Sequence, residues 1–291
     1  MKKYLLLSLI FLMVMFISGC GESIYSGAAD TTTSEANTDQ MDFDFINGKC
    51  QPIISYYDSK ILNEETLSDD DIYKYVSAIL TCSGFDIVKG IDSILLTGGS
   101  DIYKTSGDLM GISVIDMNTS KFLQEYYDKA ISVCYDRKVE LEKDELSLNT
   151  TNLTICGLAG MMGTVVNMSA MMLNTSGGGA NKLELTEAGF QDFATNEMES
   201  TLAAQGLGSY LKEKSDFLGY LNRGLTIGED GADTIGSLIG QSDFSSVLSD
   251  LARQLRDSNG DITEPSLLGY LKNSLGLPIP NQPIPPVPPI P

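Results

Sequence analysis

One stretch of the sequence, DSNGDITE, has oxygen-bearing side chains at the spacing of metal ligands: Asp257, Asn259, Asp261 and Glu264. Carboxylate and amide oxygens at alternate positions of a loop are the ligands that Ca²⁺ prefers. The stretch lies between two segments with the apolar spacing of amphipathic helices, so we expect it to form a loop. Two interpretations are open: a calcium site, or a polar turn whose Thr263 caps the next helix.

With its glycine and isoleucine, Gly260 and Ile262, the same stretch resembles the first part of the calcium-binding loop of an EF-hand or a dockerin. The resemblance implies that these four side chains would hold calcium. The stretch departs from such loops because it lacks about two residues before Ile262 and the bidentate glutamate at the loop's end. The residues suggest no other cofactor.

Composition limits the remaining chemistry. The chain of 291 residues has no His, no Trp and a formal net charge of −20. A Ser-His-Asp or Cys-His catalytic group and a His-containing zinc site are therefore excluded. So acidic a protein repels nucleic acid. Two carboxylates working together could still catalyse hydrolysis, although the sequence singles out no pair.

Four cysteines remain once Cys20 is set aside, and none belongs to a Cys-x-x-Cys motif. An even number in an exported chain indicates structural disulfides, and four cysteines allow three pairings. Residues equidistant from the turn of an antiparallel helix pair lie level with each other. Cys50 and Cys82 are centred on position 66, and Cys134 and Cys156 on position 145, both inside polar stretches. This symmetry predicts the disulfides Cys50–Cys82 and Cys134–Cys156.

The first 19 residues have the features of an export signal. Lys2 and Lys3 precede an apolar run that is too short to span a bilayer comfortably. The run ends in Ile-Ser-Gly-Cys at Cys20, which resembles the lipobox of bacterial lipoprotein signals. The resemblance implies cleavage before Cys20 and lipid attachment to it. An ordinary signal peptide that happens to end in Cys is the alternative.

The residue after Cys20 also bears on location. In bacterial lipoproteins an Asp at this position favours the inner membrane, whereas this chain has Gly21. The resemblance therefore implies an outer-membrane anchor that faces the periplasm. Residues 20–43 are small, polar and acidic, which predicts a flexible tether with a span of roughly 25–30 Å.

Helical hairpins are predicted for residues 44–174. Between positions 121 and 138, apolar residues recur at the spacing of an amphipathic helix. The segment from Leu153 to Leu173 carries no charge, which indicates a buried core helix, with a membrane span as the alternative. In the preceding hairpin, Ser68 and Asp71 suggest a capping box. The intervening Asp69 and Asp70 add negative charge at the helix start, with a cation site as the alternative interpretation of this acidic run.

The sequence Tyr56-Tyr57-Asp58-Ser59-Lys60-Ile61 recurs as Tyr126-Tyr127-Asp128-Lys129-Ala130-Ile131. Two helix pairs with the same internal pattern suggest a stacked array. Gly48, Ile53, Tyr57 and Ile61 are similar in placement to the glycine, small, aromatic and apolar positions of a tetratricopeptide-type repeat. The resemblance implies an all-α fold of stacked hairpins, either a TPR-like solenoid or an irregular helical bundle.

The rest of the chain divides into further helices and a tail. A helix is expected through Phe85 and Leu95. The segment over residues 101–120 is ambiguous, since it could be a short helix and residues 112–115 could be extended. Asn118 or Thr119 is expected to cap the central hairpin. Residues 175–276 are predicted to be a C-terminal helical region in which Thr186 caps one helix and Gly228–Gly231 interrupts the pattern. Residues 277–291 form a proline-rich tail of polyproline II type.

The function favoured by these features is that of a membrane-anchored envelope lipoprotein. It would act as a binding or assembly scaffold with a protein partner, because the catalytic inventory is small and hairpin arrays expose grooves. A carboxylate-based envelope enzyme and a calcium-stabilised structural lipoprotein are the alternatives.

Overall fold

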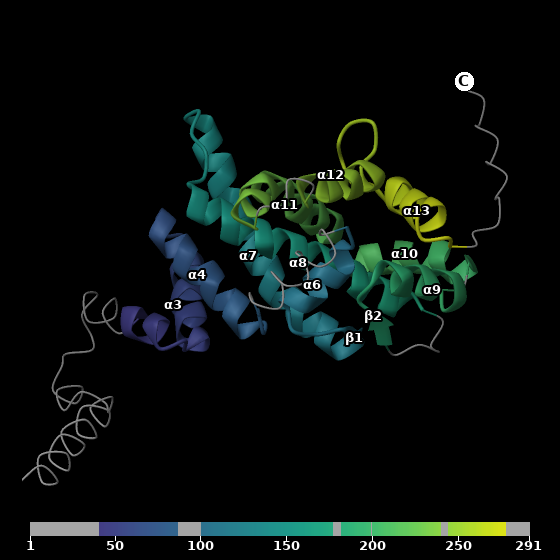
Figure 1. Cartoon of the computed structure of the whole chain (residues 1–291), viewed down its shortest axis with the longest axis horizontal. Helices are drawn as coiled ribbons and strands as arrows, with labels where there is room; N and C mark the ends of the chain where they lie inside the picture. The colour runs from purple at the N-terminus through teal and green to yellow at the C-terminus, as the bar shows by residue number, and fades with distance from the viewer. Residues whose placement is uncertain (1–40, 87–99, 177–181, 199, 240–243, 278–291) are drawn as a thin grey trace, which may run out of the picture. The chain divides into compact units, whose positions relative to one another are not determined.

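The computed structural model describes residues 41–86, 100–176, 182–198, 200–239 and 244–277 (Figure 1). The chain divides into two compact units, residues 1–47 and 48–291. In the first unit the described part is a helix over residues 41–46. The leader, Cys20 and most of the tether lie outside the described residues. So do the expected helix beyond residue 86 and nearly all of the tail.

The described part of the second unit is helical apart from two short strands, which confirms the all-α prediction. Its elements in chain order are α3 (Cys50–Leu62), α4 (Asp69–Cys82), α6 (Ile102–Leu109), β1 (Val114–Asp116), α7 (Met117–Lys143), α8 (Thr150–Thr175), β2 (Lys182–Glu184), α9 (Glu187–Asn196), α10 (Ser200–Glu213), α11 (Phe217–Ile239), α12 (Phe244–Leu255) and α13 (Glu264–Asn273).

The first hairpin consists of α3 and α4. Ser68 caps α4 by accepting a hydrogen bond from the backbone N–H of Asp71, and the Asp71 carboxylate accepts one from the backbone N–H of Ser68. This reciprocal pair is the predicted capping box. The apolar stripes of the two helices face each other, with Ile53, Tyr57 and Ile79 essentially inaccessible to solvent.

The second hairpin consists of α7 and α8, the longest described helices. The cap of α7 differs from the expectation, because Asp116 rather than Asn118 or Thr119 is the N-cap and accepts the backbone N–H of Thr119. Aspartate is a strong N-cap, and β1 ends at this residue, so the chain enters the helix directly from a strand. The ambiguous segment before this cap contains both expected forms, the short helix α6 and the extended strand β1.

Helix α8 forms the centre of the second unit, and Figure 1 shows it among α6, α7 and α11. Nearly all of its side chains from Cys156 to Leu173 are buried, which confirms the predicted buried helix. By length and composition α8 could cross a membrane, the one such helix among the described residues. However, 94% of its most apolar window is buried inside the protein. Core helices of soluble proteins share this property, so the feature is weak evidence for a span.

Helix α11 makes the most extensive contact with α8. The prediction that Gly228–Gly231 interrupts the helical pattern is wrong, because α11 runs without a break through both glycines. A Cβ added at Gly157 would lie 2.7 Å from the Cα of Gly231, and one added at Gly160 would lie 2.5 Å from the carbonyl oxygen of Gly224. The glycines therefore serve close helix packing, which offsets their low helix propensity.

This contact also joins the two regions that the sequence suggested, residues 44–174 and 175–276. Helix α8 packs against α4, α6 and α7 on one side of that boundary and against α10 and α11 on the other. In a solenoid each hairpin contacts only its neighbours. The described helices therefore form the second of the two expected architectures, an irregular bundle around α8.

The remaining elements complete the described bundle. Strands β1 and β2 pair antiparallel, with Ile115 opposite Leu183. Thr186 caps α9 as predicted, by accepting the backbone N–H of Gly189. Helix α12 packs on α11 and α13, and its apolar stripe includes the buried Phe244, Leu248 and Leu255.

Candidate functional site

The structure joins Cys50 to Cys82 and Cys134 to Cys156, the two pairs expected from the sequence. The Cα atoms of the pairs are 5.6 and 5.8 Å apart, within the ordinary range for a disulfide. Each bond links the two helices of one hairpin. The cysteines are thus structural, since disulfides hold α3 to α4 and α7 to α8.

The stretch with Asp257, Asn259, Asp261 and Glu264 is organised as a turn. One carboxylate oxygen of Asp257 accepts the backbone N–H groups of Asn259 and Asp261, at 2.8 and 3.1 Å. Glu264 is the first residue of α13, which Thr263 caps with a capping box to Ser266. Among the described residues, no three His, Cys, Asp or Glu side chains form a group that could hold a metal ion. The local geometry therefore gives the calcium interpretation no support.

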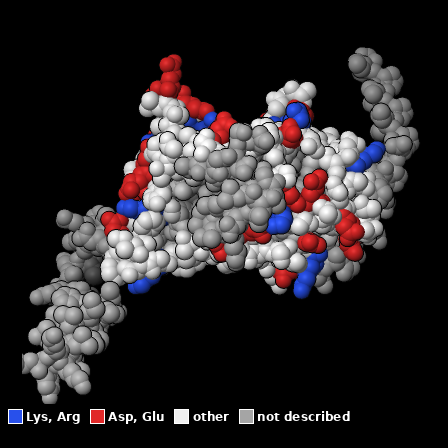
Figure 2. All heavy atoms as spheres, viewed as in Figure 1, with Lys and Arg blue, Asp and Glu red and all other residues white. Residues whose placement is uncertain are grey.

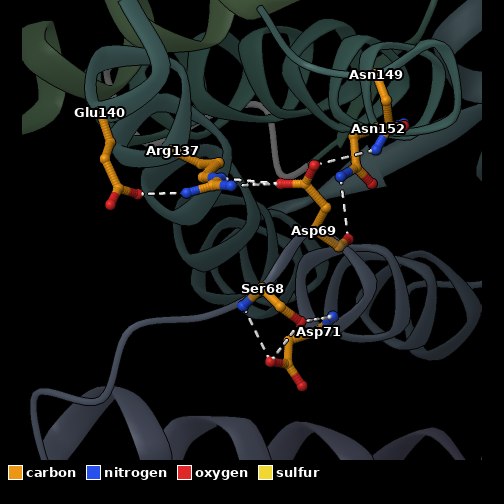
Figure 3. A network of polar contacts seen from close by, with 7 residues as sticks. All are labelled: Ser68, Asp69, Asp71, Arg137, Glu140, Asn149 and Asn152. Carbon is orange, nitrogen blue, oxygen red and sulfur yellow. Dashed lines mark hydrogen bonds and ion pairs between the residues drawn. The ribbon is translucent and has the colours of Figure 1, made fainter. Parts of the chain in front are cut away.

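A polar network connects the two hairpins at Asp69, the first residue of α4 (Figure 3). The Arg137 guanidinium of α7 donates a hydrogen bond from Nε to one Asp69 carboxylate oxygen at 2.9 Å, and its Nη2 forms an ion pair with the same oxygen at 2.9 Å. The side-chain amide of Asn152 in α8 donates to the Asp69 carbonyl at 3.0 Å. Three helix segments from the two disulfide-linked hairpins therefore meet at one aspartate.

Arg137 has a second carboxylate partner within its own helix, Glu140, at 2.7 Å. The hydrogen bond to Glu140, followed by the contact with Asp69, raises the pKa of Arg137 above its ordinary value. The other acids of the predicted run are also paired, Asp70 with Lys74 and Asp71 with Ser68. The run Asp69-Asp70-Asp71 is thus explained by capping and ion pairing.

Two adjoining hollows lie along α3 and α7, and we call them together the α3–α7 groove. The larger has a volume of about 500 Å³ and is lined by residues of α3, α4, α7 and α11. The smaller has a volume of about 340 Å³ and extends to the loop between α3 and α4. Ile61 and Val133 line both hollows, so the two meet at an apolar point.

The lining of the groove is both acidic and apolar. The larger hollow contains Asp58, Glu125 and Asp128 with a single basic residue, Lys129. The smaller contains four acids with a single basic residue, Arg137. At the end of α3, Ile61 is 40% exposed and Leu62 is 84% exposed, although both are large and apolar. The groove can therefore offer carboxylates and apolar contact area to the same ligand.

Asp58 is fixed in place by two partners in the larger hollow. The Tyr75 hydroxyl donates to one of its carboxylate oxygens at 2.6 Å, and the Lys129 ammonium group contacts the other at 2.7 Å. Burial, together with this hydrogen bond, raises the pKa of Tyr75 far above its ordinary value, so the phenol stays a donor. These contacts tie α3, α4 and α7 together beneath the hollow.

Asp128 has a different environment. Burial raises the pKa of its carboxyl to about 6, against the opposing effects of a hydrogen bond from Asn167 and the charges of Lys214 and Arg223. The Asn167 side-chain N–H donates to the Asp128 carboxylate at 2.9 Å. The Gln124 side-chain N–H in turn donates to the side-chain oxygen of Asn167 at 2.6 Å. The carboxyl therefore lies at the end of a buried polar chain and faces the groove.

The sequence interpretation did not identify this groove, although one signal pointed to it. Asp58 and Asp128 are the equivalent aspartates of the repeated Tyr-Tyr-Asp sequence, and both line the larger hollow. The repeat could therefore have marked them as a pair. Nothing in the sequence indicated that Tyr220 of α11 lines the same hollow.

The chain matches no protein-family model, no curated protein and no solved structure.

Proposed function

We propose that the protein is an envelope lipoprotein that is anchored to a membrane through Cys20 and acts as a binding or assembly scaffold. The sequence around Cys20 supports the anchor, and Gly21 supports the outer membrane, with the folded part in the periplasm. A polar segment over residues 20–43 would allow the bundle to reach a partner away from the membrane surface.

The observation that carries the scaffold proposal is the α3–α7 groove on a bundle held by two disulfides. Its exposed Leu62 and Ile61 lie beside carboxylates, a combination typical of recognition surfaces. Disulfides suit an oxidising compartment outside the cytosol. The net charge of −20 argues against nucleic acid as the partner, and Figure 2 shows acidic groups toward both sides of the visible face with basic groups interspersed.

Two measurements test the proposal. Radiolabelled fatty acid supplied to expressing cells should enter the wild-type protein and not the Cys20→Ala variant, because only the cysteine sulfur and its new amino group accept lipid. Affinity purification from solubilised envelopes should recover a protein in stoichiometric amount. Equal labelling of both proteins would exclude the lipid anchor, and recovery of the bait alone would exclude a stable scaffold.

A further inference from the structure

We infer that the α3–α7 groove binds a cationic, amphipathic peptide segment of a partner protein. This inference rests on the proposed scaffold function and adds the chemistry of the partner and the surface that receives it. It depends on three properties of the groove: its charge, the incomplete internal neutralisation of that charge, and the apolar residues between the charges.

The charge of the groove is strongly one-sided. Its larger hollow contributes three acids and one lysine, and its smaller hollow contributes four acids and one arginine. Two like-charged clusters on adjoining hollows attract positive charge over several ångströms and repel anionic ligands. The groove therefore selects against acidic peptides, nucleic acid and anionic lipid headgroups.

The two basic residues of the groove neutralise only part of this charge, because each is already paired with acidic side chains. Lys129 is paired with Asp58, and Arg137 is paired with Asp69 and Glu140. The exposed carboxylates of Glu125 and Asp136, both on α7, take part in no ion pair within the described part of the chain. A lysine or arginine of a ligand can thus pair with them without breaking an existing contact.

Apolar residues separate the charged ones and explain why the ligand is amphipathic. Ile61 and Val133 lie where the hollows meet, and the neighbouring Leu62 is 84% exposed. Small polycations such as spermine would satisfy the carboxylates and leave these side chains in water. An apolar side chain between two basic ones on the same peptide would cover them and gain the hydrophobic contribution.

The aromatic ring of Tyr220 also lines the groove. It lines the larger hollow on the α11 side, and its ring already lies 4.5 Å from the guanidinium carbon of Arg223. Aromatic rings attract cations at such distances. Arg223 already makes this contact, so Tyr220 contributes lining area to the hollow, and a ligand's basic side chain would pair with the carboxylates of α7.

Fluorescence anisotropy with the full chain tests the inference. The probe is a synthetic amphipathic peptide with lysines on one helical face and leucines on the other, and the controls are a scrambled peptide and one with glutamate in place of lysine. We expect binding of the first peptide alone, weakened about tenfold or more between about 0.05 and 0.5 M salt.

Matched variants locate the site. Glu125→Gln with Asp136→Asn removes two groove charges, and Glu184→Gln with Asp233→Asn removes two exposed charges from β2 and α11 outside the groove. At two- to fivefold for each lost ion pair, the groove variant should bind about tenfold more weakly, and the control variant should bind like the wild type. Leu62→Ser should weaken binding about fivefold or more without altering its salt dependence.

Equal weakening in the two double variants would overturn the inference, because it would show attraction to net charge alone. Binding of the glutamate peptide, or an unchanged affinity in Leu62→Ser together with full competition by spermine, would do the same. Fatty-acid labelling of Cys20 is a separate measurement. Its failure would leave the groove intact, and loss of peptide binding would leave the anchor intact.

Discussion

The close packing of α8 on α11 predicts that one methyl group added at Gly160 destabilises the fold strongly. In Gly160→Ala, the added Cβ would lie 2.5 Å from the Gly224 carbonyl oxygen, 2.6 Å from a side-chain carbon of Ile227 and 2.9 Å from the Gly228 nitrogen. Two of these three atoms belong to the backbone of α11. The clash therefore cannot be relieved by a rotamer change alone, and the helices must move apart.

The expected cost follows from two opposing effects. Overpacking of a core costs about 1–3 kcal/mol, and contact with backbone on this extensive interface favours the upper end of that range. Alanine stabilises a helix interior by about 1 kcal/mol relative to glycine. We therefore expect Gly160→Ala to lower the free energy of unfolding by about 2 kcal/mol.

Gly269 in α13 offers a matched control, because a Cβ added there meets no atom within 4 Å. Gly269→Ala should raise the free energy of unfolding by about 0.5–1 kcal/mol through helix propensity alone. The two variants then differ by about 3 kcal/mol for the same chemical change.

Urea unfolding followed by circular dichroism at the helical band measures both values under identical conditions. The slope of the transition should stay unchanged, since the same surface is exposed on unfolding. If Gly160→Ala proved as stable as Gly269→Ala, α8 and α11 would not approach at Gly160 as described, and the central packing of the bundle would be wrong.

Two further predictions concern the polar contacts. Because burial raises the pKa of Asp128 to about 6, the folded state binds the proton more tightly than the unfolded chain, and its contribution to stability is present below about pH 4 and lost as the pH rises through 6. Relative to the wild type, Asp128→Asn should therefore gain on the order of 2–3 kcal/mol of unfolding free energy between pH 4 and pH 7. Urea titrations of both proteins at the two pH values measure this gain. If the difference in unfolding free energy between variant and wild type were the same at both pH values, the burial of this carboxyl would be contradicted. At the hairpin junction, a double-mutant cycle with Arg137→Ala and Asp69→Asn should give a coupling energy of about 1 kcal/mol, and a value near zero would show that the contact does not hold the hairpins together.

The parts of the fold that were predictable from sequence depend on local patterns. The Ser68–Asp71 capping box and the Thr186 cap require residues three positions apart. The pairing of Cys134 with Cys156 required only that the turn lie midway between them. In each case the physical cause lies within one helix or one hairpin, so its residue pattern is visible without knowledge of the tertiary structure.

The parts that were missed depend on packing between distant segments. Gly228 and Gly231 looked like helix breakers because the glycines that accommodate them, Gly157 and Gly160, are about seventy positions earlier. The groove was missed for a related reason. Asp58 and Asp128 were visible as a repeat, but the hollow that they share exists because α3, α4 and α11 pack around α7. The lipid anchor at Cys20 stays a prediction.

The position of α8 at the centre of the bundle has a consequence for synthesis. Its main partner, α11, begins at Phe217, about forty residues after α8 ends at Thr175. At about 5–20 residues per second, the apolar surface of α8 waits roughly 2–8 s for that partner, whereas chain collapse takes microseconds. In this interval α8 can pack only on the elements before it and on the smaller contacts that β2 and α10 provide as they are made. The growing chain therefore exposes an apolar, uncharged helix to its surroundings, and a chaperone that holds unfolded chains would bind between Leu153 and Leu173.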